Sequence, residues 1–300
     1  MITSRDNKWL KAFRAALRGK GPNSPGGGAS DGADARKWIG AEGPKLVQDA
    51  LAAGLEAEAM LVSESGEPDA EKILRAAAES DAGISRSRIF RTTDKLFASV
   101  SGTESPQGVA ALFRQKDWSL EDVLRGASAI REASSLVMVL AAVQDPGNVG
   151  TVLRSAEAFG ATGVVTTKGS ADPWSPKALR ASAGAALRLP VLRGMAIPVL
   201  LAQLRVAGVK IYAAGAHQRG AVPEASGGDL TEPCAIFIGS EGAGLPPEVE
   251  SAADAQITIP ITGVESLNAG VAASILLYEA ARQRRDQVAA VGKQAHGASR

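Results

Sequence analysis

Short apolar segments alternate with helical stretches through residues 135–284, and this alternation constrains the fold most strongly. Strands that alternate with helices form a mostly parallel sheet with helices on both faces. We therefore expect an α/β domain of this kind. The predicted strands are 136–143, 163–167, 210–214, 235–238 and 257–261, and the predicted helices are 149–159, 176–182, 197–206 and 267–284.

The N-terminal part carries a second, smaller α/β pattern, so the sequence predicts two domains. Helices are expected near 44–53, 69–78 and 92–99, and strands near 59–62 and 108–114. The expected organisation is a first domain over 1–114, a polar linker over 115–134, a second domain over 135–288 and a disordered tail over 289–300. Within the first domain, the Gly- and Pro-rich residues 21–34 are expected to be flexible.

Residues 1–20 contain six Lys and Arg residues and one acidic residue, Asp6. The segment also has the apolar spacing of an amphipathic helix, with Ser4 as a possible N-cap. Such a basic helix suggests an anionic partner, although a solvated surface helix remains an alternative. The apolar positions are Trp9, Leu10, Phe13, Ala16 and Leu17.

Composition excludes several classes of protein. A single cysteine, Cys234, and two histidines, His217 and His296, do not supply a usual structural zinc site, so no metal is expected. No apolar segment reaches the roughly 20 residues needed to cross a bilayer, and no secretory signal is visible. We therefore expect a cytoplasmic protein. Aromatic residues make up only 4% of the chain, so any nucleic acid would be bound mainly through phosphates and shape.

Three loops at predicted strand ends are rich in Gly, Pro, Asn and acidic residues: 145–150, 239–246 and 260–268. Parallel sheets bind ligands at the carboxyl ends of their strands, so we expect the chemistry at these loops. No Walker loop occurs, which argues against nucleoside triphosphate hydrolysis. The glycines at 239, 242 and 244 reverse the spacing of a dinucleotide-binding loop.

Asn148 and Arg154 stand at the start of a predicted helix in the first of these loops. Taken alone, Asn148 could be a structural N-cap and Arg154 a surface residue. The motifs Asn148-x-Gly150-x-x-x-Arg154, Ile238-Gly-Ser-Glu-Gly-x-Gly-Leu245, and Ile259-Pro-Ile with Ser266-Leu-Asn268 together resemble SpoU-type RNA ribose 2′-O-methyltransferases of the SPOUT superfamily.

The N-terminal domain adds to this resemblance. The segments Ile2-Thr-Ser-Arg-Asp-Asn, Glu42-Gly-x-Lys45-Leu-Val and Thr103-Glu-Ser-Pro-Gln-Gly-Val109 are similar to the substrate-binding domain of longer family members. That domain resembles a ribosomal-protein-type RNA-binding fold. The resemblance implies a small N-terminal RNA-binding domain and a C-terminal parallel-sheet domain with a trefoil knot.

The resemblance also implies the cofactor and the site. S-adenosylmethionine would be the methyl donor, bound by Gly239, Ile259 and Leu267. The implied catalytic residues are Asn148, Arg154, Glu241, Ser266 and Asn268. A homodimer would bring Arg154 of one subunit near the cofactor of the other.

Local chemistry leaves alternatives open at three of these positions. Glu241 could hold the backbone N–H groups of its own Gly-rich turn, and Ser266 and Asn268 could cap the following helix. The separate N-terminal domain resembles ribosomal-RNA members of the family more than the compact transfer-RNA members, which implies 23S ribosomal RNA as substrate, with transfer RNA as the alternative. A catalytically inactive RNA-binding relative is a further alternative.

Overall fold

The computed structural model describes residues 1–19, 38–79, 88–126, 134–215 and 228–297. The predicted flexible segment 21–34 lies outside these residues. The chain divides into two compact units. The first comprises Met1–Asp117 and Trp174–Arg188, and the second comprises Trp118–Pro173 and Leu189–Arg300.

The first unit contains a four-stranded sheet with the order β1-β4-β2-β3. Strands β2 and β3 run parallel, whereas β4 is antiparallel to both β1 and β2. Successive side chains of the central strands β2 and β4 point to opposite faces of the sheet, and nearly all of them are buried, which explains why these strands are apolar. The strands are β1 (Trp38–Glu42), β2 (Ala57–Ser63), β3 (Ile89–Thr92) and β4 (Val109–Arg114).

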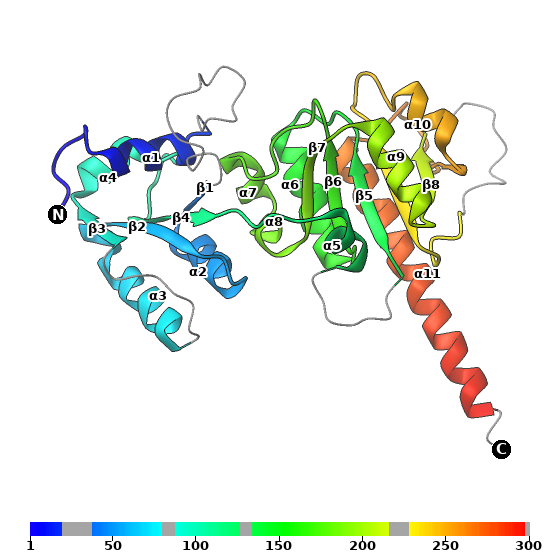
Figure 1. Cartoon of the computed structure of the whole chain (residues 1–300), viewed down its shortest axis with the longest axis horizontal. Coiled ribbons are helices and arrows are strands. Elements are labelled where there is room, and N and C mark those ends of the chain that lie inside the picture. The colour runs from blue at the N-terminus through cyan, green and yellow to red at the C-terminus, as the bar shows by residue number, and fades with distance from the viewer. Residues whose placement is uncertain (20–37, 80–87, 127–133, 216–227, 298–300) are drawn as a thin grey trace. The chain divides into compact units, whose positions relative to one another are not determined.

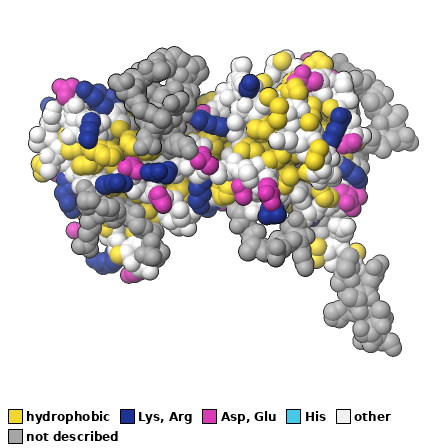
Figure 2. Space-filling model, in the orientation of Figure 1, with side chains coloured by type: hydrophobic (Ala, Val, Ile, Leu, Met, Phe, Trp, Pro, Cys, Tyr) yellow, Lys and Arg dark blue, Asp and Glu magenta, His cyan; other side chains and the backbone are white. Residues whose placement is uncertain are grey.

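Helices cover both faces of this sheet (Figure 1). Helices α1 (Lys8–Leu17) and α4 (Asp94–Val100) pack on one face. Helices α2 (Pro44–Ala52) and α3 (Glu67–Glu79) pack on the other, and the short 3-10 helix η2 (Glu64–Gly66) precedes α3. On the face shown in Figure 2, Lys and Arg side chains are spread over this unit.

The N-terminal basic helix is an integral part of the first unit. Leu10, Phe13 and Leu17 of α1 are buried in the core, which confirms the predicted amphipathic face. The N-cap is Asn7, whose side-chain oxygen accepts a hydrogen bond from Trp9 N at 2.9 Å, so the expected cap Ser4 was three residues too early. Removing this helix would therefore expose core side chains.

The second unit contains a six-stranded sheet with the order β10-β8-β9-β5-β6-β7, in which every pair is parallel. This confirms the predicted α/β class. The strands are β5 (Leu136–Leu140), β6 (Gly163–Thr167), β7 (Val191–Met195), β8 (Lys210–Ala214), β9 (Cys234–Ile238) and β10 (Ala255–Ile257).

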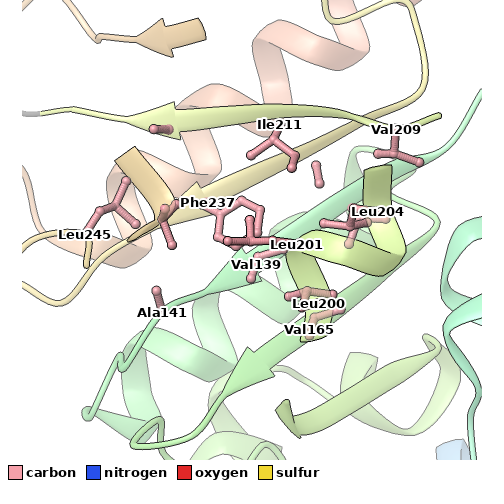
Figure 3. Packing of buried hydrophobic residues seen from close by; sticks show 14 of the residues in the cluster. Val139, Ala141, Val165, Leu200, Leu201, Leu204, Val209, Ile211, Phe237 and Leu245 are labelled. Carbon is pink, nitrogen blue, oxygen red and sulfur yellow. The ribbon is translucent and has the colours of Figure 1, made fainter. Parts of the chain in front are cut away.

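One face of this sheet packs against α5 (Leu120–Arg125), α9 (Ile197–Val206) and α10 (Pro247–Ala252). Figure 3 shows leucines of α9 directed at Val139, Val165 and Phe237 of the strands. The other face is covered by α6 (Pro146–Ala158) and α11 (Ala269–Gly297), which also pack against each other. The short helices α7 (Pro176–Ala181) and α8 (Ala185–Arg188) belong to the first unit.

Two expected boundaries are corrected by the structure. The predicted linker 115–134 contains α5, which a Ser119–Asp122 capping box begins and a fully buried Val123 anchors. The predicted disordered tail 289–300 is helical through Gly297, because α11 continues without a break. The last three residues lie outside the described part. None of the described helices is long and apolar enough to cross a membrane.

Candidate functional site

The three loops singled out in the sequence meet at the carboxyl end of the parallel sheet in the second unit. The loop after β5 leads into α6, the loop after β9 carries the Gly-rich segment, and the loop after β10 leads into α11. Strands β5 and β9 are direct neighbours in the sheet. Their loops therefore emerge side by side, as the parallel topology predicts.

A cavity of about 150 Å³ lies among these loops. Gly239, Ile259 and Leu267, the three expected cofactor-binding residues, all line it. Glu241 and Ser266, two of the expected catalytic residues, line it as well. The other lining residues are mostly small or apolar: Ala214, Gly215, Ile238, Ser240, Gly244, Leu245, Ile257, Ile261, Ala269, Ala272 and Leu276.

Backbone proximity explains why position 239 is a glycine. A methyl group on Gly239 would lie 2.2 Å from the carbonyl carbon and oxygen of Gly244, far inside van der Waals contact. The loop doubles back here, because Gly244 N donates to Ser240 O at 2.9 Å. Gly244 has a φ of +68°, which a residue with a side chain adopts only at a cost. The glycines thus fold the loop into one wall of the cavity.

Three polar side chains from the three loops form one hydrogen-bonded cluster beside the cavity. Glu241 Oε1 accepts from Asn148 Nδ2 at 2.9 Å and from Asn268 Nδ2 at 2.6 Å. Asn268 Nδ2 also lies 3.0 Å from Asn148 Oδ1. The backbone N–H of Ala269 approaches Glu241 Oε1 at 3.4 Å. The structure therefore brings together three of the five expected catalytic residues.

The hydrogen bonds of Glu241 and Asn268 decide between the local alternatives. Glu241 accepts from the other two loops, so its described contacts are not those of a residue that holds only its own turn. Asn268 does cap α11, because its Oδ1 accepts from Gly270 N at 2.9 Å and Val271 N at 3.2 Å. Its amide nitrogen serves the cluster at the same time. Ser266 has no side-chain hydrogen bond within the described residues and does not cap α11 there.

Helices α6 and α11 are held against each other just below this cluster. Ser155 of α6 and Ser274 of α11 share a hydrogen bond of 2.7 Å. Gly270 permits the close approach, because a Cβ at that position would lie 3.3 Å from Thr151. The distance between Asn148 and Asn268 is thus fixed by the packing of α6 against α11 as well as by the hydrogen bonds of the two side chains.

Arg154 lies apart from the cavity of its own chain. It is exposed on α6 and does not line the cavity, and its side chain forms no ion pair or hydrogen bond with the described residues. The structure thus does not place Arg154 with the other expected catalytic residues.

Sequence reasoning missed part of the cavity wall. Ala214 and Gly215 follow β8, and Ala269, Ala272 and Leu276 belong to one face of α11. The end of β8 could have been included, because every strand of a parallel sheet ends at the same edge. The contribution of α11 depends on how that helix is rotated, which the sequence alone leaves open.

The described residues give no support to a metal site or to a cysteine nucleophile. No group of three or more His, Cys, Asp and Glu side chains is arranged to hold a metal ion among them. Cys234 is buried at the start of β9, and burial raises the pKa of its thiol. The protonated thiol is a poor nucleophile, which agrees with a packing role for Cys234.

Comparisons with known proteins agree with this site. Residues 135–278 match the SpoU rRNA Methylase family, and residues 34–111 match the MRM3-like substrate binding domain. The 23S rRNA (guanosine(2553)-2′-O)-methyltransferase RlmP of Bacillus subtilis is 32% identical over 243 residues, which cover 79% of this chain and 86% of RlmP. An uncharacterized tRNA/rRNA methyltransferase of Mycobacterium marinum is 34% identical over 248 residues, covering 81% and 76% of the two chains.

A solved structure shows the same fold. The AdoMet-bound rRNA methyltransferase of Sinorhizobium meliloti superimposes with a TM-score of 0.75 and 29% sequence identity, covering 94% of this chain and 97% of that one. The fold, the site and these similarities define an S-adenosylmethionine-dependent RNA methyltransferase. The chain belongs to the SpoU rRNA methylase family.

The residues of the cavity fit this cofactor. S-adenosylmethionine combines a flat adenine, a ribose and an amino-acid part, and it needs both apolar walls and polar rim groups. Ile238, Ile257 and Leu276 supply apolar surface, while the Gly-rich loop brings backbone groups close. Ser266 and Glu241 supply polar side chains at the same cavity.

Proposed function

We propose that this enzyme methylates the ribose 2′-oxygen of a nucleotide in large-subunit ribosomal RNA. The cluster of Asn148, Glu241 and Asn268 beside the cavity is the observation that carries this proposal. The similarity to B. subtilis RlmP supports both the ribose 2′-oxygen and 23S RNA as targets. Transfer RNA is the alternative substrate, since other relatives are described as tRNA/rRNA methyltransferases.

The protein's contribution to the reaction is mainly orientation. When bound, S-adenosylmethionine supplies an activated methyl group on a positively charged sulfur. Gly239, Ile259 and Leu267 would hold the cofactor by backbone and apolar contacts. The cluster fixes the ends of α6 and α11 at the rim, where the ribose would enter. Positioning of this kind accounts for a large part of the rate in transfer reactions.

Arg154 orients the substrate in this proposal and does not act as a base. An arginine side chain stays protonated in proteins, so it cannot accept the hydroxyl proton. Its planar set of donors suits a ribose hydroxyl and an adjacent phosphate, and it stabilises developing negative charge on the oxygen. The proton would pass to phosphate or water. The freedom of Arg154 within its own chain leaves it available for such contacts.

We further propose that the enzyme is a homodimer. Val271, Ile275 and Tyr278 are 46%, 39% and 49% exposed on α11. Their spacing of four and three residues places them on one side of the helix. Helix α11 packs against α6, the helix that carries the exposed Arg154. A second copy would cover this apolar surface. The same contact would let Arg154 of one subunit reach the cavity of the other, which explains its absence from its own.

Three further properties complete the proposal. The trefoil knot implied by the family would be formed where the chain passes from β9 through the loop after β10 into α11. The cytoplasm is the proposed location, because the ribosomal RNA substrate is found there. The N-terminal unit, including the basic face of α1, would bind the RNA through its phosphates.

A methyl-acceptor assay tests the substrate class. The wild-type protein would be incubated with tritiated S-adenosylmethionine and, separately, unmodified large-subunit RNA, small-subunit RNA and transfer RNA. We expect label in large-subunit RNA. Label confined to transfer RNA would replace the proposed substrate. Cofactor binding without label in any RNA would favour an inactive RNA-binding relative.

A further inference from the structure

The cavity has one charged side chain among the described residues that line it, that of Glu241. The rest of this lining is apolar, small or uncharged. No Lys or Arg forms an ion pair with Glu241 within the described residues, so no described cation of its own chain neutralises its charge. The two amides that bond to it, those of Asn148 and Asn268, carry no net charge. Among the described lining residues, Glu241 therefore contributes the only formal charge, and this charge is negative.

Hydrogen bonds hold this carboxylate in one place. All its described hydrogen bonds, from Asn148, Asn268 and Ala269, converge on Oε1. Oε2 has no hydrogen-bond partner among the described residues. An exposed glutamate normally samples several rotamers, but here the hydrogen bonds of the cluster hold the carboxylate among the residues that line the cavity.

The charge of the ligand changes during the established reaction. S-adenosylmethionine carries a sulfonium, an ammonium and a carboxylate, whereas S-adenosylhomocysteine has lost the sulfonium charge together with the methyl group. A fixed negative charge attracts the first more than the second. Contacts that both ligands make contribute equally to the two affinities, so they do not affect the difference between them.

We propose that Glu241 is a charge-selective residue that favours the methyl donor over the spent product. After transfer the attraction between Glu241 and the sulfur centre disappears, which promotes release of S-adenosylhomocysteine. This role is separate from orienting the ribose. It depends on the cofactor and not on the identity of the RNA. The role of Glu241 can therefore be disproved while the proposed substrate stands, and the proposed substrate can be disproved while the role of Glu241 stands.

Calorimetric titration in the absence of RNA tests the proposal. S-adenosylmethionine, S-adenosylhomocysteine and sinefungin, whose amine carries a positive charge near the position of the sulfonium, would be titrated into the wild-type protein and the Glu241→Gln variant. The glutamine side chain would keep an oxygen acceptor for the cluster and remove the charge. We expect the preference for each charged ligand over S-adenosylhomocysteine to fall about threefold to tenfold.

The control is Glu265→Gln, which removes an exposed charge from a residue outside the cavity lining. Its ligand preference should match that of the wild type. The same preference in wild type and Glu241→Gln would overturn the proposal, as would an equal fall in Glu265→Gln. If Glu241→Gln bound neither ligand, the wild-type preference measured at rising salt would decide, because a charge effect weakens with ionic strength. A salt-independent preference would contradict a role for charge.

Discussion

At the scale of single residues, the wall of the cavity includes a position that has no room for a side chain. This position is Gly239, because a Cβ added there would collide with the backbone of Gly244. Gly242 stands three residues later in the same loop and faces open space. Comparing variants of Gly239 and Gly242 therefore distinguishes a steric requirement at one position from a general preference for glycine in the loop.

We predict that Gly239→Ala weakens S-adenosylmethionine binding by about tenfold or more, since the loop must move to admit the methyl group. Gly242→Ala should bind the cofactor as the wild type does. Calorimetry with both variants measures the difference, and thermal unfolding checks that each remains folded. Equal affinity in the two variants would show that the close approach at Gly239 does not shape the cavity.

Resemblance predicted Gly239, Ile259 and Leu267 as cofactor-binding residues, and all three line the cavity. Their role in binding the cofactor stays a prediction, and the sequence did not predict how the polar residues beside the cavity interact. The bonds from Glu241 to Asn148 and Asn268 join residues 93 and 27 positions apart, and periodicity carries no information on such contacts. The position of Arg154 outside its own cavity was likewise implied only by resemblance.

At the scale of elements, the sequence predicted the strongly periodic segments and missed the short ones. The apolar strands β5, β6, β8 and β9 were expected, since continuous apolar runs mark buried parallel strands. Strand β7, with sequence Val-Leu-Arg-Gly-Met, lies at the sheet edge and has exposed residues, so its pattern is weak. The predicted strand 257–261 is wrong in its bounds: β10 runs from Ala255 to Ile257, and the predicted range included Pro260, which cannot donate to a ladder.

Helix α11 forms the back wall of the cavity, and Arg284 anchors it to the sheet. The Arg284 guanidinium donates to the backbone carbonyls of Ser134, Ser135, Leu230 and Glu232. These carbonyls lie just before β5 and β9. A guanidinium carries five N–H donors in a fixed planar arrangement, whereas a lysine ammonium carries three on one atom.

We predict that Arg284→Lys lowers the free energy of unfolding by about 2–3 kcal/mol, because several backbone carbonyls lose their charged donor. The control is Arg285→Lys at the neighbouring exposed position, where a change within about 0.5 kcal/mol is expected. Urea unfolding of both variants provides the measurement. Similar values for the two would mean that Arg284 does not anchor the helix.

Helix α1 lies outside the residues that match the substrate-binding family model, yet its apolar side belongs to the core. Lys8 and Lys11 are exposed on its outer side. Reversing their charges tests RNA binding without opening the core, which deletion of the helix would do. Lys72 and Arg75 on α3, which packs on the opposite face of the sheet, provide a matched pair.

The double change Lys8→Glu and Lys11→Glu should weaken RNA binding by about tenfold and flatten its dependence on salt, because phosphate contacts are lost. Lys72→Glu with Arg75→Glu changes the net charge equally and should have a much smaller effect. Filter binding at several salt concentrations distinguishes the two. An equal loss in both variants would indicate that overall charge, and not α1, governs binding.

At the scale of the whole molecule, the proposed homodimer would bring Arg154 of one subunit to the cavity of the other. The exposed apolar stripe on α11, formed by Val271, Ile275 and Tyr278, predicts that the protein elutes at twice the mass of one chain. Ile275→Glu places a charge in the stripe and should yield monomers with reduced methyl transfer, since burying an unpaired charge is costly. Val206→Glu, at a position 91% exposed on α9, is the control and should remain dimeric.

Size-exclusion chromatography with light scattering measures both variants. A wild-type monomer that retains full methyl transfer would remove the basis for sharing Arg154 between subunits. A dimer that persists in Ile275→Glu would place the interface elsewhere.

The central claim is that the cavity and the Asn148–Glu241–Asn268 cluster direct methyl transfer to a ribose 2′-oxygen. The most direct test is to incubate the wild-type enzyme with unmodified large-subunit RNA and S-adenosylmethionine, digest the RNA to nucleosides and locate the added methyl group by mass spectrometry. We predict a nucleoside whose ribose fragment, and not its base fragment, carries the added mass. A methyl group on the base would contradict the account.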